Sequence, residues 1–196
     1  MIDDIVIINY SAGNLFSVQT ACRRLGYEPV ITDSPGVIAG AAKIIVPGVG
    51  SSGSAMESLR SAGLSCLIPR LTQPVLGICL GMQLMYSQLD ESDEKGLKIF
   101  DGRVKLFGSS GLPVPHMGWN RVTGLKGPIF KGVEDNEWFY FVHSYMAPVG
   151  SETIAACNYG EHFAASASRD NFFGCQFHPE KSGDAGLRVI KNFLEL

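Results

Sequence analysis

The segment PVLGICLGMQ, residues 74–83, joins a strand-like run to a helix-like run across two glycines. Val75 to Ile78 is a short apolar run, the pattern of a strand that is buried on both faces. Gly77 and Gly81 stand two residues before and two after Cys79, which gives the Gly-x-nucleophile-x-Gly form of a nucleophile elbow. Small residues at these positions allow a very sharp turn, so the segment predicts Cys79 at the carboxyl end of a central strand.

The same alternation of strand and helix extends through the first half of the chain. Strands are expected at 5–9, 29–32, 43–46 and 75–78, and helices at 15–25, from 35, at 54–62 and at 80–89. Continuous apolar strands that alternate with helices predict a parallel sheet covered on both faces. The acidic stretch at 90–94 is expected to be a solvated loop after a helix.

The second half has a different pattern. Short strand candidates at 103–107, 138–142, 153–158, 163–168 and 172–177 are separated by Gly, Pro and Asn turns, which favours antiparallel pairing. An amphipathic helix is expected at 187–194. The chain is therefore predicted to be one α/β domain over residues 1–196. Its sheet is mixed and mainly parallel, flanked by helices, with antiparallel additions in the second half.

Composition excludes several classes of protein. The chain has 196 residues, a formal net charge of −3 and no basic stripe, so we expect no nucleic-acid partner. The longest nearly apolar run, residues 75–86, is too short to span a bilayer, and the acidic start is not a secretory signal, so we expect a cytoplasmic protein without a membrane partner. Five widely spaced cysteines without Cys-x-x-Cys argue against a disulfide framework or a zinc site. No metal is expected.

A glycine loop at 46–53, VPGVGSSG, contains the Gly-x-Gly-x-x-Gly of dinucleotide-binding turns. That use requires an acidic residue about 20 positions on, at the end of the next strand. Here no Asp or Glu occurs between Glu57 and Asp90, and the next strand ends in Gly-Ile-Cys. Nucleotide binding is therefore disfavoured.

Cys79 has a candidate base and a candidate orienting carboxylate. Its sulfur is expected at a helix N-terminus, where the helix dipole favours thiolate. In Phe177-His178-Pro179-Glu180, residues two apart in an extended segment point the same way, so Glu180 can fix the tautomer of His178. Together they form a Cys-His-Glu set, a cysteine version of the serine triad. The alternative for Cys79 is a buried cysteine in a glycine turn, and the alternative for His178 and Glu180 is a plain His-Pro-Glu turn.

Two of these segments resemble the class I (triad-type) glutamine amidotransferases: residues 74–83 and QFHPEKS at 176–182. Further blocks are similar to one subfamily, the glutaminase subunits of imidazole glycerol phosphate synthase. These blocks are NY at 9–10 with GNL at 13–15, PGVG at 47–50, PHMGWN at 115–120 and FVHSY at 141–145. They lie in order over nearly the whole chain, and Pro-His-Met-Gly-Trp is the most specific of them.

The resemblance implies glutamine hydrolysis by Cys79, His178 and Glu180, without a cofactor. It places the oxyanion on the amides of Val49 and Leu80, so the glycine loop would hold a developing charge rather than a pyrophosphate. The glutamine-binding residues that it implies are Gly50, Gln83, Ser144 and Tyr145. It also implies a heterodimer with a separate (β/α)₈ synthase (cyclase) subunit that receives the ammonia in histidine biosynthesis. The docking candidates are Asn14, Met117, Trp119, Tyr140 and Lys181.

Several alternatives stay open from the sequence. Asn9, Ser11-Ala12 and Cys175 depart from the usual residues of the subfamily, and paralogues with the same blocks supply ammonia to surface-sugar amidating enzymes. A non-enzymatic redox or binding module would lack His or Glu of the triad, and a cysteine protease or other amidase would lack the Pro-His-Met-Gly-Trp block. Trp119 could also be a core aromatic residue.

Overall fold

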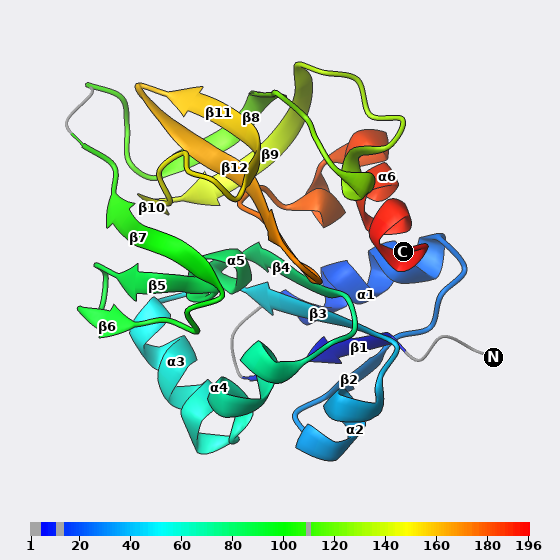
Figure 1. Cartoon of the computed structure of the whole chain (residues 1–196). Coiled ribbons are helices and arrows are strands. Elements are labelled where there is room, and N and C mark those ends of the chain that lie inside the picture. Colours follow the sequence, from blue (N-terminus) through cyan, green and yellow to red (C-terminus); the bar gives the residue numbers. More distant parts are fainter. Residues whose placement is uncertain (1–4, 11–13, 109–110) are drawn as a thin grey trace.

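The computed structural model describes residues 5–10, 14–108 and 111–196 (Figure 1). Within these residues the strands form a nine-stranded sheet and a smaller four-stranded sheet. In sheet order, the large sheet consists of β2 (Val30–Thr32), β1 (Ile5–Ile8), β3 (Lys43–Gly48), β4 (Val75–Cys79), β13 (Phe172–Cys175), β12 (Glu161–Arg169), β11 (Thr153–Tyr159), β8 (His116–Thr123) and β9 (Glu137–His143). The small sheet has the order β10 (Tyr145–Met146), β7 (Phe100–Leu106), β5 (Tyr86–Leu89) and β6 (Glu94–Lys95).

Strand direction divides the large sheet into two parts. The pairs from β2 through β1, β3 and β4 to β13 are parallel. The pairs from β13 through β12, β11 and β8 to β9 are antiparallel. The prediction of a mixed α/β sheet, parallel first and antiparallel later, is confirmed.

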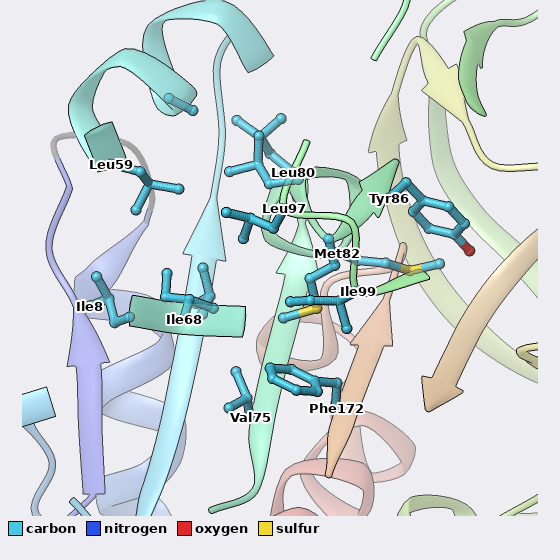
Figure 2. Close-up of a cluster of buried hydrophobic side chains, with 14 of the residues drawn as sticks. Ile8, Leu59, Ile68, Val75, Leu80, Met82, Tyr86, Leu97, Ile99 and Phe172 are labelled. Carbon is cyan, nitrogen blue, oxygen red and sulfur yellow. The ribbon is translucent and has the colours of Figure 1, made fainter. Parts of the chain in front are cut away.

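Helices cover both faces of the parallel part. They are α1 (Leu15–Arg24), α2 (Pro35–Gly40), α3 (Ser52–Ser61), α4 (Leu64–Leu67), α5 (Leu80–Leu84) and α6 (Gly183–Leu194), with short 3₁₀ turns η1 (Ile68–Arg70), η2 (Pro128–Phe130) and η3 (Pro179–Lys181). Side chains alternate along a strand, so β1 sends Val6 and Ile8 to one core and Ile5 and Ile7 to the other. The first core packs against α2, α3 and α4, and the second against α1 and α6. Figure 2 shows part of the first core, with Ile8, Leu59 and Val75 among its labelled side chains.

Asn14 begins α1 as predicted, because its side chain accepts a hydrogen bond from the Ser17 backbone N–H at 3.3 Å. The helix predicted at 80–89 is wrong beyond Leu84, because Tyr86–Leu89 is strand β5. The carbonyl of Leu84 accepts from the Leu97 amide at 2.7 Å, so the helix cannot continue its own ladder. That approach depends on Gly96, where a Cβ would lie 2.2 Å from the Tyr86 carbonyl oxygen.

Two other expectations are corrected. The acidic stretch at 90–94 follows a strand rather than a helix, and its carboxylates are engaged: Arg103 pairs with Asp90 and Arg60 with Glu94. Strand β8 falls on the Pro-His-Met-Gly-Trp block and was not predicted, although it pairs with β9 along its length. Its apolar and polar residues do not alternate cleanly, so periodicity gives it no clear signal.

Candidate active site

Three adjacent parallel strands deliver the candidate residues to one edge of the sheet. Gly48 is paired with Cys79 in the register of β3 with β4, and Ile78 is paired with Cys175 in the register of β4 with β13. The segments that leave the carboxyl ends of these strands are therefore neighbours, although they lie far apart in the sequence. In open α/β sheets this edge is where ligands bind.

Close backbone packing forms the elbow at Cys79. The residue has φ +53°, a left-handed conformation that non-glycine residues adopt rarely and at a cost. A Cβ at Gly81 would lie 1.8 Å from the Val46 carbonyl oxygen, and a Cβ at Gly77 would lie 2.7 Å from the Met82 amide nitrogen. The two glycines are thus required by close approach, as the Gly-x-nucleophile-x-Gly pattern predicts.

Hydrogen bonds hold the candidate base. His178 Nδ1 lies 2.9 Å from Glu180 Oε1, and the two side chains are 2 % and 1 % exposed. Ser182 Oγ donates to the His178 carbonyl at 2.6 Å and accepts from the Tyr140 amide at 3.0 Å. The Tyr140 carbonyl in turn accepts from the His178 amide at 2.9 Å. Both the backbone N–H and the backbone C=O of His178 are therefore tied to β9, the C=O through Ser182.

The electrostatics of His178 favour its protonated form. Burial lowers the pKa of His178, but Cys79 and Glu180 together outweigh burial and raise this pKa to about 10. Nε2 of His178 has no hydrogen-bond partner among the described residues. A buried imidazole oriented by a carboxylate, with one nitrogen free toward a cysteine, is suited to exchange a proton with that sulfur.

A cavity of about 330 Å³ opens at Cys79. It is lined by Val49, Gly50, Cys79, Leu80, Gln83, Glu91, Pro115, Val142, His143, Ser144 and Tyr145. All six residues predicted to bind the oxyanion or glutamine are in this lining. His178 and Glu180 are not in this lining.

Tyr10 supports the loop that carries Val49. Its hydroxyl donates to the Pro47 carbonyl, and burial together with Cys79 raises the pKa of Tyr10 far above its ordinary value. Val49 itself is 42 % exposed, and Gly50 has φ +100°, the left-handed region that favours glycine. The sequence analysis quoted Tyr10 as part of a block but assigned it no role.

Glu91 and His143 also line the cavity and were missed as site residues. Glu91 Oε2 accepts a hydrogen bond from the Ser52 amide at 2.6 Å, which places this carboxylate at the cavity rim rather than in a free loop. The acidic run around it concealed the signal. His143 stands in the block at 141–145, and its sequence neighbours give no sign of its partners, the His116 ring and the Tyr145 carbonyl.

The tautomers of a buried histidine pair follow from one carbonyl. His143 Nδ1 lies 2.8 Å from the Tyr145 carbonyl oxygen, so Nδ1 carries the proton and Nε2 accepts. His116 Nδ1 therefore donates to that Nε2 at 3.0 Å, and His116 Nε2 is left to accept from Asn120 Nδ2 at 3.3 Å. Burial lowers the pKa of His116 to about 4 and that of His143 to about 3, so both are neutral at pH 7.

The docking candidates divide into a surface group and one helix cap. Met117 and Trp119 are 63 % and 52 % exposed on β8, so Trp119 is not a core residue. The ring of Trp119 meets that of Tyr140 edge-on at 6.1 Å, and Lys181 Nζ lies 6.0 Å from the Tyr140 ring centroid. Asn14 uses its side chain to cap α1.

Phe16, which the sequence analysis did not single out, is 77 % exposed on α1. It lines a second cavity, of about 230 Å³, together with Glu180.

The other cysteines differ from Cys79. Cys22, Cys157 and Cys175 are buried, and burial raises the pKa of each to about 12, so they are thiols at neutral pH. Cys66 is exposed. Among the described residues, no group of three or more His, Cys, Asp or Glu side chains is placed to hold a metal ion, and no helix there is long and apolar enough to cross a membrane.

Comparison with known proteins agrees with this geometry. A family model described as glutamine amidotransferase class-I matches residues 6–196. The chain is 51 % identical over 195 residues to the imidazole glycerol phosphate synthase subunit HisH of Yersinia pseudotuberculosis, covering 98 % of this chain and 100 % of that protein. It is 50 % identical, with the same coverage, to the subunit of that name from Escherichia coli strain K12. A crystal structure of a glutamine amidotransferase superposes with a TM-score of 0.75 at 18 % identity over 97 % of each chain, a likeness of fold.

Proposed function

Since the chain belongs to the class-I glutamine amidotransferase family, among the HisH subunits of imidazole glycerol phosphate synthase, we propose how its residues carry out the reaction. The protein is a glutaminase subunit in histidine biosynthesis, and it hydrolyses glutamine to glutamate and ammonia. We assign the chemistry to Cys79, His178 and Glu180. The supporting observation is the buried His178–Glu180 pair, which leaves Nε2 of His178 without a partner and interacts with a cysteine that lines a cavity.

The first half of the reaction forms a thioester. The Cys79 sulfur attacks the side-chain amide carbon of glutamine, and His178 holds the thiol proton. The amides of Val49 and Leu80 stabilise the tetrahedral oxyanion, for which each such donor is typically worth about 10²–10³ in rate. His178 then gives its proton to the leaving nitrogen, and ammonia departs. Glu180 keeps His178 in the tautomer and orientation that this transfer needs.

The second half releases glutamate. Water attacks the glutamyl thioester while His178 accepts the proton of that water. Collapse of the second tetrahedral intermediate breaks the carbon–sulfur bond, and the proton returns to the Cys79 sulfur. The same oxyanion donors serve both intermediates, because both place negative charge on the same oxygen.

The cavity walls supply the recognition of free glutamine. The Glu91 carboxylate faces the cavity and would accept the α-ammonium group. Gly50, Ser144 and Tyr145 line the cavity around the rest of the amino-acid end. Both N–H groups of Gln83 Nε2 are engaged, with the Tyr145 carbonyl and with Gln176 Oε1, so Gln83 would meet the substrate through its own Oε1.

The ammonia acceptor is a separate subunit of the same synthase. We propose a heterodimer with a (β/α)₈ cyclase that docks on Met117, Trp119, Tyr140 and Lys181, with Asn14 at the start of α1. The exposure of Met117 and Trp119 supports this surface. We further propose that residues 1–196 form one amidotransferase domain and that the enzyme works in the cytoplasm. The runner-up, a paralogue that feeds a surface-sugar amidating enzyme, has the same chemistry but a different acceptor.

The test is glutamate release from glutamine, with and without a cyclase subunit of the histidine pathway and its nucleotide substrate. We expect little release from the isolated chain and strong stimulation by the two additions together. If the additions do not stimulate release but a glutamine-analogue alkylator still labels Cys79, the glutaminase chemistry stands and the ammonia acceptor is another enzyme. We infer that docking sets the oxyanion loop, because Val49 is flanked by glycines on which a peptide can reorient at little cost. High turnover of the isolated chain would contradict this inference.

A further inference from the structure

Gln176 is a fully buried polar residue at the nucleophile, with 0 % exposure. It stands between the end of β13 and His178. Its Nε2 donates to Cys79 Sγ at 3.7 Å, and its Oε1 accepts from Gln83 Nε2 at 2.9 Å. Its backbone amide donates to the Ala165 carbonyl at 2.9 Å, which fixes the residue to the middle of β12.

One backbone carbonyl sets the orientation of this glutamine pair. Gln83 Nε2 also donates to the Tyr145 carbonyl at 2.8 Å, and a carbonyl oxygen only accepts. The nitrogen of Gln83 must therefore face both Tyr145 and Gln176, so the atom of Gln176 that faces Gln83 is its oxygen. This leaves the nitrogen of Gln176, a donor, on the side of the sulfur.

Two sequence spacings bring these groups together. Cys79 and Gln83 are four residues apart at the start of α5, and positions i and i+4 share one face of a helix. Gln176 and His178 are two residues apart in an extended segment, so they point to the same side. Because Cys175 is paired with Ile78, the segment that begins at Gln176 runs directly beside Cys79.

We propose that Gln176 is a positioning residue that holds the Cys79 sulfur toward the cavity and stabilises negative charge on it during attack. The other hydrogen-bond contact of Sγ given by the structure is with the Val142 carbonyl at 3.8 Å, which accepts from a thiol and offers nothing to a thiolate. Gln176 is uncharged, so unlike His178 it supplies its donor in both protonation states of the site. This inference rests on the proposed role of Cys79 as the nucleophile.

The test compares the alkylation of Cys79 in full-length variants. Iodoacetamide is applied at pH 7, and the rate constants at Cys79 and at exposed Cys66 are measured by peptide mass mapping. Gln176→Met removes the donor at similar volume. Gln176→Glu keeps the shape and an acceptor for Gln83, and it replaces the donor to the sulfur by a negatively charged carboxylate oxygen. Gln73→Met is the control, because it removes the same amide from a place away from the site, where Gln73 Nε2 donates to the Ile38 and Ala39 carbonyls.

We expect Cys79 to react faster than Cys66 in the wild type. Both Gln176 variants should lose about 10- to 100-fold in the Cys79 rate, the usual range for a hydrogen bond to a charged group, with Cys66 unchanged. Gln73→Met should keep the wild-type rate at Cys79. In the complex with the cyclase subunit, kcat for glutamine should fall with the alkylation rate, while KM stays within about threefold.

Three results would overturn the proposal. Wild-type alkylation of Cys79 in Gln176→Glu would show that the donor does not act on the sulfur. A raised KM with unchanged kcat would show that Gln176 merely holds Gln83 for substrate binding. A wild-type Cys79 that reacts no faster than Cys66 would contradict the proposed function as well, which separates that failure from a failure of Gln176 alone.

Discussion

Cys79 and His178 follow adjacent strands, β4 and β13, but the molecule holds them in different ways. The Cys79 elbow is fixed by backbone atoms so close that Gly77 and Gly81 have no room for a side chain. His178 is fixed by hydrogen bonds to Glu180, Ser182 and the backbone of Tyr140. The nucleophile is therefore held by steric exclusion and the base by polar contacts.

The difference determines how each side fails. Close packing is disrupted when a single methyl group is added. The contacts at Gly77 and Gly81 involve no titrating group, so they do not depend on pH. Hydrogen bonds are lost one at a time, and those that involve carboxylates or imidazoles depend on pH. Substitutions at the base should therefore lower the rate in steps, whereas one at the elbow should damage stability and activity together.

The largest effect is expected on the hydrogen-bonded side, from Glu180→Gln. The amide replaces an acceptor by a donor at His178 Nδ1 and favours the wrong tautomer, so kcat should fall by roughly 10³–10⁴-fold. Glu195→Gln is the control, because Glu195 is an exposed carboxylate 3.6 Å from Lys191. Steady-state glutamate release in the complex with the cyclase subunit measures both. A loss below tenfold in Glu180→Gln would remove Glu180 from the mechanism.

On the packed side, Gly81→Ala should lower the free energy of unfolding by about 3 kcal/mol or more and abolish glutamate release. The added Cβ would meet the Val46 carbonyl, which belongs to β3 and cannot move alone. Gly36→Ala, in α2, is the control, because a Cβ there would meet nothing within 4 Å. Urea denaturation measures both variants. Equal unfolding midpoints would disprove steric exclusion at the elbow.

A smaller effect is expected from Ser182→Ala, which removes one support of His178 and leaves the Tyr140 amide without its acceptor. Stability should fall by about 1–3 kcal/mol, and kcat by roughly tenfold, because His178 is less firmly oriented. Ser166→Ala removes a comparable buried hydrogen bond, to the Gly174 carbonyl. It should cost similar stability with little change in kcat. Equal kcat in the two variants would mean that Ser182 does not orient the base.

The smallest effect is expected outside both sides, in the buried pair of His116 and His143, and it depends on pH. The pKa of His116 is about 4 when folded, below the value near 6.5 expected when unfolded, so its contribution to stability is lost as the pH falls through this range. The His116→Gln variant does not lose this stability, because glutamine does not titrate. The difference in free energy of unfolding between wild type and variant should therefore shrink by about 1–2 kcal/mol between pH 8 and pH 5. Urea titrations at the two pH values measure it, and a constant difference would refute the lowered pKa.

The sequence predicted local features better than features that depend on distant residues. Continuous apolar strands and the spacing of Gly77 and Gly81 around Cys79 are local signals, and both agree with the structure. The end of α5 was missed because the Leu84 carbonyl accepts from the amide of Leu97, a distant residue that no local pattern reveals. Strand β8 was missed because its pairing with β9, rather than its own periodicity, makes it a strand.

The candidate site shows the same limit. The motifs predicted the lining residues Val49, Gln83 and Tyr145, which the structure brings to one cavity. They did not indicate that Glu91 would turn toward that cavity, because its place depends on a hydrogen bond with the distant Ser52 amide. Nor did they indicate the contact of Gln176 with the sulfur, which follows from the register of β4 with β13.

The most direct test of the central claim is glutamate release by Cys79→Ala in complex with the cyclase subunit and its nucleotide substrate. The account predicts release at the level of the blank, while the same complex still makes product when ammonium salt replaces glutamine. The second result shows that the cyclase subunit is active, and co-elution of the variant with that subunit shows that the variant is folded and docked. Glutamine-dependent turnover near that of the wild type would contradict the assignment of Cys79 as the nucleophile.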